Sequence, residues 1–365
     1  MSNEGNVLNF FLSANTPHGF FSRFEQLSDP YQSIAQFIIK SGPGTGKSSL
    51  MKKIAKKAYE SGESVELIHC SSDPDSLDGV ILKNSKISIV DGTAPHVIEP
   101  KFPYAFENVI TLYDLIDESK IRPHRDEIIE LFGENKIYHE RTCRFLSAAG
   151  SLLNDTYRIA LDCTDTEKIG RYTYRLAHRE FRIRKNAVST EQIRFLSALT
   201  KDGIVMYTDT TQKLCDKIYI LDDSWGAVSR LILFALRSYA IAANHDIISC
   251  YCPVSPYDKL EHLFIPELRI GFITSNKWHK LAPSDNCKTI HCSRFMNMEK
   301  FAEKKQRINF NRKAIGELLG EASLLMREAH NTHDKIEEYY INAMNFDALN
   351  EKTDEIIKDI FEKIN

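Results

Sequence analysis

An internal repeat constrains the fold of this chain more than any other feature. The pattern FLSA-x-T-x-x-G begins at Phe11 and begins again at Phe195, 184 residues later. Further pairs match in the same order at shifts of 182 or 183 residues: Cys70 and Cys252, Pro74 and Pro256, Leu77 and Leu260, Ile87 and Ile270, His96 and His279. Collinear matches at one spacing indicate a duplicated unit rather than two unrelated ones. A chain of 365 residues also has room for two domains.

Each repeat predicts the same succession of elements. The apolar pattern gives a first strand (37–40; 217–221), a helix (47–61; 229–244), a second strand (64–70; 246–252) and a third strand (86–90; 269–274). Strands that alternate with helices favour a parallel sheet with right-handed crossovers. The remainder of each repeat has helical spacing of apolar residues, so each core should carry a helical appendage. We therefore predict an α/β fold with two tandem domains, 1–190 and 191–365.

Composition excludes several classes of protein. The chain is 42% hydrophobic and 27% charged, as in ordinary globular proteins, and its net charge of -3 gives no electrostatic reason to expect nucleic acid or an anionic membrane as the main partner. The most apolar stretch, 231–243, is too short to span a bilayer and contains Arg237. No secretory leader is recognisable at the N-terminus, and eight irregularly spaced cysteines suit a reducing compartment. We expect a cytoplasmic protein without a membrane partner.

A glycine-rich loop in the first repeat is the clearest chemical signal. Residues 41–48 read SGPGTGKS between an apolar strand and an amphipathic helix, which matches the phosphate-loop pattern G-x-x-x-x-G-K-[ST] with Ser41 in place of the first glycine. Glycines let backbone N–H groups turn toward an anion, and the helix directs its positive end at the same place. Lys47 is expected to bridge the β- and γ-phosphates, and Ser48 to ligate Mg²⁺. The predicted nucleotide contacts are Gly42, Pro43, Gly44, Thr45, Gly46, Lys47, Ser48 and Ser49.

A second metal-binding group is predicted at the end of the third strand. Residues 87–91 form an apolar strand that ends in Asp91, about 40 residues after the loop, where a carboxylate holds Mg²⁺ through water in phosphate-loop proteins. The usual following glutamate, which positions water for hydrolysis, is absent, because Gly92 and Thr93 stand there. Rapid intrinsic hydrolysis is therefore not expected.

Other polar residues near the loop allow two interpretations. The segment 70–79, CSSDPDSLDG, follows the second strand at the edge where open α/β sheets bind ligands. Asp73 and Asp75 are candidate catalytic carboxylates there, but Asp, Ser, Pro and Gly also make solvated turns. His96 is a candidate contact to the γ-phosphate or substrate, and a packing role suits it equally because its counterpart His279 lies in a repeat without the loop motif.

The second repeat does not keep the phosphate loop. The aligned residues 223–230 read DSWGAVSR, so that Gly226 alone survives, while Ser229 and Arg230 replace the lysine and serine. Thr274 stands where the first repeat has Asp91. We predict that this repeat does not bind a nucleoside triphosphate in the usual manner and is a structural or regulatory copy.

Two further groups of residues could carry chemistry. A zinc site would use Cys250, Cys252, Cys287, Cys292, His279 and His291, although the spacing is not that of a zinc ribbon and buried thiols are the simpler interpretation. A basic stretch could supply an arginine finger or contact nucleic acid, or could be a solvated helix face; it contains Arg171, Arg175, Arg179, Arg182, Arg184 and Lys185.

These motifs together resemble the P-loop nucleoside triphosphatases. More narrowly, the chain is similar to a family of tandem-P-loop ATP-binding proteins of spore-forming firmicutes, through the FLSA-x-T-x-x-G blocks, SGPGTGKSS at 41–49, CSSDPDSLDG at 70–79 and DGTAPH at 91–96. The resemblance covers both halves. It implies a three-layer α/β/α phosphate-loop fold in each half and ATP binding, while the altered second loop departs from a two-site version.

The sequence leaves three functions open. In the first, the N-terminal half is an enzyme that hydrolyses Mg-ATP slowly or passes its γ-phosphoryl group to an acceptor, with Lys47 stabilising phosphate charge, Asp91 holding Mg²⁺, and Asp73 or Asp75 as the base. In the second, ATP binding switches a scaffold that engages a protein partner without catalysis. The third, less favoured, is a nucleic-acid-dependent ATPase.

Overall fold

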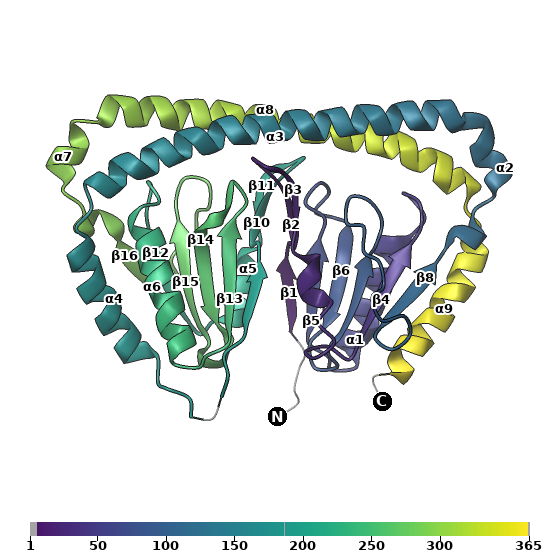
Figure 1. Cartoon of the computed structure of the whole chain (residues 1–365), viewed down its shortest axis with the longest axis horizontal. Helices are drawn as coiled ribbons and strands as arrows, with labels where there is room; N and C mark the ends of the chain where they lie inside the picture. Colours follow the sequence, from purple (N-terminus) through teal and green to yellow (C-terminus); the bar gives the residue numbers. More distant parts are fainter. Residues whose placement is uncertain (1–5, 186, 364–365) are drawn as a thin grey trace. The chain divides into compact units, whose positions relative to one another are not determined.

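The computed structural model describes residues 6–185 and 187–363, and the chain divides into two compact units (Figure 1). The first unit takes the chain up to Ser13, then Ser22–Thr142, and the chain from Leu324 onward. The second takes Ala14–Phe21 and Cys143–Ser323. The units therefore do not coincide with the two sequence repeats, because each repeat contributes to both.

The first unit contains a six-stranded mixed sheet with the order β1-β5-β6-β7-β4-β8. Of its five neighbouring strand pairs, two are antiparallel, because β6 runs opposite to both β5 and β7. The pairs β1·β5, β4·β7 and β4·β8 are parallel. The strands are β1 (Val7–Phe10), β4 (Ala35–Lys40), β5 (Val65–His69), β6 (Leu77–Leu82), β7 (Ile87–Asp91) and β8 (Glu107–Thr111).

The second unit repeats this sheet in the order β16-β12-β15-β14-β13-β9. Read from the opposite end, the order matches the first sheet strand for strand, and β14 is again antiparallel to both neighbours. The predicted α/β class with two repeated, largely parallel sheets is thus confirmed. The strands are β9 (Glu191–Arg194), β12 (Lys217–Asp222), β13 (Ile247–Cys252), β14 (Ser255–Ile265), β15 (Ile270–Ser275) and β16 (Cys287–His291).

The antiparallel strand of each sheet is the main difference from the predicted order of elements. The end of the segment predicted as a polar loop, 70–79, enters β6 at Leu77. The connection from β5 to β6 is only 70–76, which is too short for a crossover helix, so the chain must turn back antiparallel. Because the polar loop ends in this strand, Asp78 becomes part of the buried sheet.

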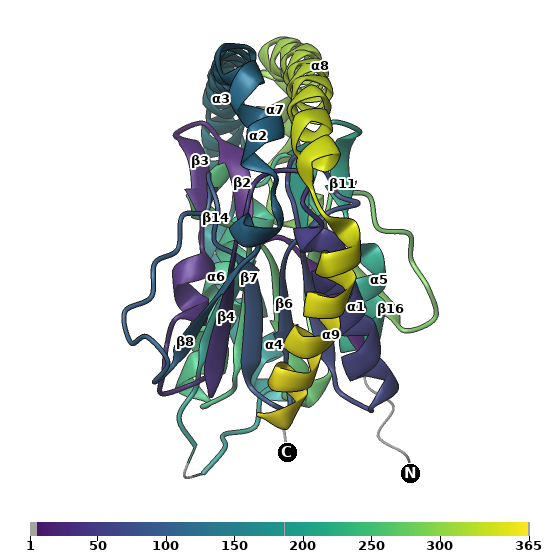
Figure 2. The ribbon, with the colours of Figure 1, turned by 90° about the vertical axis from the view of Figure 1, so that its right-hand side faces the viewer.

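The main helices cover one face of each sheet. In the first unit, α1 (Lys47–Glu60) and α9 (Phe346–Glu362) lie side by side (Figure 2) and pack in one apolar cluster with Phe37 and Ile39 of β4. The other face has a 3-10 turn, η1 (Phe24–Leu27), in the first unit and a seven-residue helix, α5 (Thr208–Leu214), against β15 in the second. The second helical layer predicted for each core is therefore reduced to these short elements.

The two repeats exchange their helices. The long helix α3 (Arg125–Asp162) leads from the first repeat into the second unit, where α4 (Thr166–Glu180) packs against α6 (Val228–Ala242). Conversely, α8 (Lys305–Ala343) leads into the first unit, where α9 completes the apolar cluster. Each core thus carries a helical appendage, as predicted, but the appendage comes from the other repeat.

The FLSA-x-T-x-x-G motif forms a tight hairpin in both repeats. In β2 (Ser13–Thr16) and β3 (Gly19–Ser22), the Thr16 hydroxyl donates to the carbonyl of Gly19 at 2.8 Å; in β10 (Ser197–Thr200) and β11 (Gly203–Met206), the equivalent distance is 3.0 Å. Both glycines have positive φ, +101° and +95°, which explains their place in the motif. The remaining short helices are η2 (Tyr113–Leu115), α2 (Glu118–Ile121), η3 (Arg122–His124), η4 (Pro266–Leu268), η5 (Cys292–Phe295) and α7 (Met298–Ala302).

Candidate functional site

The glycine-rich segment 41–46, here called loop 1, connects the end of β4 to the start of α1. Gly44 and Gly46 have φ values of +66° and +85°, which side chains with a Cβ rarely adopt. No side chain caps the start of α1, where Gly46 is the capping residue. Backbone N–H groups in such a turn are available to an anionic group. Of the other predicted contacts, Thr45 is buried and donates to the Gly42 carbonyl at 2.8 Å, whereas Ser49 is exposed and Pro43 is partly buried.

The structure brings Lys47 and Asp91 together, as the sequence predicts. The Lys47 ammonium donates to the carbonyl of Gly42 at 2.6 Å and lies 3.6 Å from Asp91 Oδ2. Both side chains are largely buried. The other oxygen of Asp91 accepts from the N–H and the hydroxyl of Thr93, at 2.9 and 2.5 Å, so the carboxylate has a fixed orientation.

Ser48 and the two aspartates of the segment 70–79, Asp73 and Asp75, have different surroundings in the structure. The Ser48 hydroxyl accepts from the Leu77 N–H at 3.0 Å and so ties α1 to β6. Asp73 accepts from the Ser76 hydroxyl at 2.8 Å, and its carbonyl accepts from the Ser76 N–H, as expected of a turn. Asp75 is exposed. The segment therefore contains a turn at Asp73, and Asp75 faces solvent.

A buried ion pair joins His96 to Asp78 on β6. The His96 Nε2 atom lies 2.9 Å from the carboxylate, and the Phe24 ring lies 4.9 Å from the imidazole ring. Burial opposes protonation of His96, but the Asp78 charge outweighs it and raises the pKa of the imidazole. In the second unit, His279 lies 3.6 Å from Glu261 at the matching positions. Because the pair persists where the phosphate-loop residues are lost, a packing role suits His96 better than a γ-phosphate contact.

The sequence reasoning missed the groups that cover loop 1. They belong to the end of α8 and the start of α9, almost 300 residues later. A Cβ on Gly42 would stand 2.6 Å from the Tyr340 ring, one on Gly44 would meet Ile341 at 2.9 Å, and one on Gly46 would meet Leu349 at 2.8 Å. Glycine at these three positions permits the close contact with the helices, and at Gly44 and Gly46 it also permits the backbone conformation of the loop.

A carboxylate from α8 also reaches the backbone of loop 1. Glu337 Oε1 accepts from the Gly44 N–H at 3.1 Å and lies 3.3 Å from His333 Nε2. The hydrogen bond from His333, with smaller contributions from the Gly44 N–H and the Lys47 charge, lowers the pKa of Glu337. At neutral pH, loop 1 therefore holds an anionic oxygen that belongs to the protein itself.

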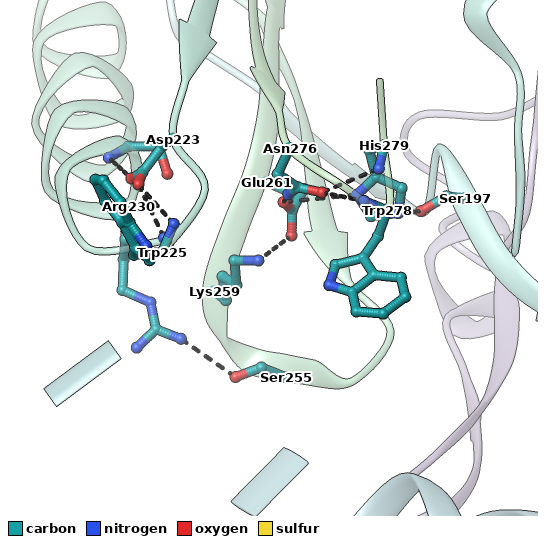
Figure 3. Close-up of polar contacts among 12 residues, drawn as sticks. Ser197, Asp223, Trp225, Arg230, Ser255, Lys259, Glu261, Asn276, Trp278 and His279 are labelled. Carbon is teal, nitrogen blue, oxygen red and sulfur yellow. Dashed lines mark hydrogen bonds and ion pairs between the residues drawn. The ribbon is translucent and has the colours of Figure 1, made fainter. Parts of the chain in front are cut away.

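The equivalent segment of the second unit, 223–227, here called loop 2, also holds a carboxylate. Asp223 is buried, and its two oxygens accept from the N–H groups of Trp225 (3.1 Å), Gly226 (3.0 Å) and Ser229 (2.7 Å), as Figure 3 shows in part. Gly226 has a φ of +74°, close to that of Gly44 in loop 1. Loop 2 therefore keeps an anion-binding backbone whose acceptor is its own side chain.

The groups around loop 2 form a buried polar cluster (Figure 3). Lys259 lies 2.6 Å from Glu261, which in turn lies near His279, and His279 Nε2 is 2.9 Å from the Ser197 hydroxyl. Burial opposes ionisation of Glu261, but the Lys259 charge holds the pKa of that carboxyl well below its usual range. Lys259 and Glu261 therefore compensate each other's charge within the protein.

The other chemical groups singled out in the sequence have structural surroundings. Among the described residues, no three His, Cys, Asp or Glu side chains gather closely enough to hold a metal ion. Burial raises the pKa of Cys252 to about 11, as expected for an unreactive thiol. Arginines of the basic stretch form ion pairs: Arg171 with Glu167, Arg179 with Glu180, and Arg184 with Glu267.

No family model, curated protein or solved structure matches this chain. The resemblance to phosphate-loop ATP-binding proteins therefore stays a prediction from the motifs. Within residues 6–185 and 187–363, no helix combines the length and apolar character needed to cross a lipid bilayer.

Proposed function

We propose that the first unit binds Mg-ATP at loop 1 and either hydrolyses it slowly or transfers its terminal phosphoryl group to an acceptor. The observation that carries the proposal is the position of Lys47, which donates to the carbonyl of Gly42 and lies 3.6 Å from Asp91. A lysine, glycine N–H groups at a helix start and a strand-end carboxylate are the groups that phosphate and magnesium require.

The backbone of loop 1 suits an anionic ligand because one of its N–H groups already donates to a carboxylate. Gly44 holds Glu337 in this way, with Lys47 close enough to lower the pKa of that carboxyl. A phosphate oxygen presents the same kind of acceptor with more charge. The hydrogen bond between Gly44 and Glu337 was not part of the motif argument, and it also indicates that loop 1 can bind an anionic oxygen.

Each residue of the site has a role in this proposal. Lys47 would exchange the Gly42 carbonyl for phosphate oxygens and neutralise part of their charge. Ser48, oriented by the Leu77 N–H, would offer its remaining lone pair to Mg²⁺, and Asp91, oriented by Thr93, would hold the ion through water. Magnesium-bound ATP would supply the phosphoryl group itself.

Slow turnover is part of the proposal. Gly92 and Thr93 follow Asp91, so no carboxylate stands directly after it on the chain. The candidate bases remain Asp73, whose carboxylate accepts from Ser76, and Asp75, which is exposed. The second unit would then be a structural or regulatory copy, because Asp223 already occupies the N–H groups of loop 2.

A second candidate function is a nucleotide-dependent switch that engages a protein partner. The contacts of Tyr340, Ile341 and Leu349 with loop 1 favour it, because a ligand there would compete with helices α8 and α9. By contrast, the ion pairs along α4 give no support to a nucleic-acid-dependent ATPase.

The test compares wild type with Lys47→Ala, using Lys56→Ala as the control. Lys56 lies on the same helix but is exposed and pairs with Glu60. Loss of a charge-assisted contact to phosphate should weaken binding of a fluorescent ATP analogue by roughly tenfold to a hundredfold in Lys47→Ala. The control should bind as wild type does.

Product analysis with labelled Mg-ATP then separates the candidates. ADP with phosphate indicates hydrolysis, ADP with another labelled product in cell extract indicates phosphoryl transfer, and binding without turnover indicates the switch. Wild-type protein that binds no ATP analogue, or that binds it no better than Lys47→Ala, refutes the proposed function.

A further inference from the structure

Loop 1 is covered by a specific part of α8, the segment 337–341, here called the plug. Three of its residues contact the loop: Glu337 accepts from the Gly44 N–H, Tyr340 packs on Gly42 and Ile341 on Gly44. Side-chain carbons of the plug stand where a Cβ on either glycine would be only 2.6 to 2.9 Å away. These side chains lie directly against the glycines, so a phosphate group that approached loop 1 from this side would have to displace them.

The charge of the plug imitates that of the expected ligand. Glu337 provides a carboxylate with a lowered pKa to the same N–H group that a phosphate would use, with Lys47 nearby. Lys47 itself donates to the carbonyl of Gly42, so its ammonium group also has a partner within the protein. The protein itself therefore supplies an acceptor for the Gly44 N–H and partners for the Lys47 ammonium.

In the second unit, a carboxylate also accepts from the loop N–H groups, but it belongs to the loop itself and cannot move away from it. There, Asp223 comes from loop 2 itself, so the acceptor for its N–H groups cannot leave without refolding the loop. The end of α3 packs on loop 2 through apolar contacts among Ala160, Trp225 and Ala227. In the first unit, the acceptor comes from a separate helix, which contacts the loop through side chains and through the Gly44 N–H.

We propose that the plug is an autoinhibitory element, which leaves loop 1 when a nucleotide binds and returns when the nucleotide dissociates. This inference rests on the proposed function of loop 1. Binding of phosphate would exchange Glu337 for a phosphate oxygen at the Gly44 N–H and would displace Tyr340 from Gly42. The measured affinity is then the intrinsic affinity reduced by the fraction of molecules whose plug is open.

Substitutions at Glu337 test this competition directly. Removal of a charge-assisted hydrogen bond that closes the site should tighten binding of a fluorescent Mg-ATP analogue by about tenfold in Glu337→Ala, and less in Glu337→Gln, which keeps an acceptor. Glu338→Ala is the matched control, because this neighbour on α8 is exposed. Circular dichroism and thermal unfolding verify that each variant is folded.

Hydrogen exchange in the wild-type protein gives a second measurement that needs no substitution at the plug. Saturating Mg-ATP analogue should increase exchange in 337–349 and should leave that segment unchanged in Lys47→Ala. Binding that is unaltered or weaker in Glu337→Ala, or exchange that slows in 337–349 with ligand, overturns the plug while leaving the proposed function intact. Absence of binding by the wild-type protein, which refutes the proposed function, overturns both.

Discussion

Backbone N–H groups at the start of a helix need acceptors, and the two loops of this chain obtain them in different ways. Loop 2 uses Asp223, one residue after its strand ends, and so satisfies three N–H groups locally. Loop 1 has Ser41 at the matching position and uses a carboxylate from a distant helix for Gly44. Loop 2 therefore supplies its own acceptor through Asp223, whereas loop 1, with Ser41 at that position, takes one from another helix.

The role of Asp223 can be measured as stability. Asp223→Ala would leave buried N–H donors without acceptors, which should lower the free energy of unfolding of the second unit by about 1–3 kcal/mol. Asp222→Ala is the control, because that neighbour is exposed and pairs with His291 at the surface. Urea denaturation of both variants is the measurement. Equal unfolding midpoints for Asp223→Ala and Asp222→Ala would mean that the stability of loop 2 does not depend on the Asp223 carboxylate.

At the residue scale, local pattern singled out two groups that the structure places close together. Lys47 and Asp91 follow from a loop-helix motif and a strand end, and parallel pairing of β4 with β7 brings the two together. Glu337 was missed because it is 293 residues from Gly44, on a helix whose sequence only indicates periodicity. The role of Asp223 was not predicted, because only the structure shows that its oxygens accept from the N–H groups of loop 2.

At the level of elements, a cluster of charged hydrogen bonds fastens α4 to the second core. Glu180, at the end of α4, accepts from Lys217 Nζ (2.6 Å), the Tyr219 hydroxyl (2.6 Å) and Arg179 Nε (2.7 Å). Burial opposes ionisation of Glu180, but these donors outweigh it and lower its pKa to about 2. The helix is therefore held by polar contacts at its end as well as by its apolar face.

The depressed pKa gives α4 docking a definite pH dependence. Ionised Glu180 stabilises the fold above its unfolded pKa of about 4.3, and this contribution is lost as the pH falls toward about 2. Glu180→Gln should therefore be less stable than wild type by about 1–3 kcal/mol at pH 7, with the gap narrowing below pH about 4. Glu167→Gln, an exposed site on the same helix, is the control. A gap that stays constant down to pH 3 in urea denaturation would contradict this account.

Elements were predicted well where periodicity alone decides them. The apolar spacing located β4, α1, β5 and β7 and their counterparts in the second repeat. Strands β6 and β14 were missed, because Asp78 and Gly79 interrupt the apolar pattern and because direction is set by the length of the connection. The positions of these two strands depend on their pairing with strands elsewhere in the sheet, which a local sequence pattern does not reveal.

For the whole molecule, the exchange of helices determines what can fold independently. The first unit needs α9, whose residues Leu349, Ile356 and Ile360 complete its apolar cluster. The second needs α4, with Ile169 and Leu176 in the matching position. Repeats of equal length had suggested a boundary near residue 190, but helical periodicity does not tell which core a helix covers.

Separate expression of the two repeats tests this dependence. Fragments 1–190 and 191–365 should each expose the apolar face that the missing helix covers, bind a hydrophobic dye and lack a cooperative thermal transition. Their co-expression should restore a soluble complex with a cooperative transition, because every core then finds its helix. A fragment 1–190 that unfolds cooperatively as a monomer would show that α4 covers the first core equally well.

The exchanged helices also carry information about descent. A protein of one repeat would have two ways to cover its sheet: fold its own helix back, or take the helix of a second copy. The present chain has kept the second geometry in both directions, which is the pattern left when the genes of a symmetric, helix-swapped homodimer fuse. In a single chain the two copies need not be identical, so aspartate can stand at position 223 while the matching position 41 carries serine.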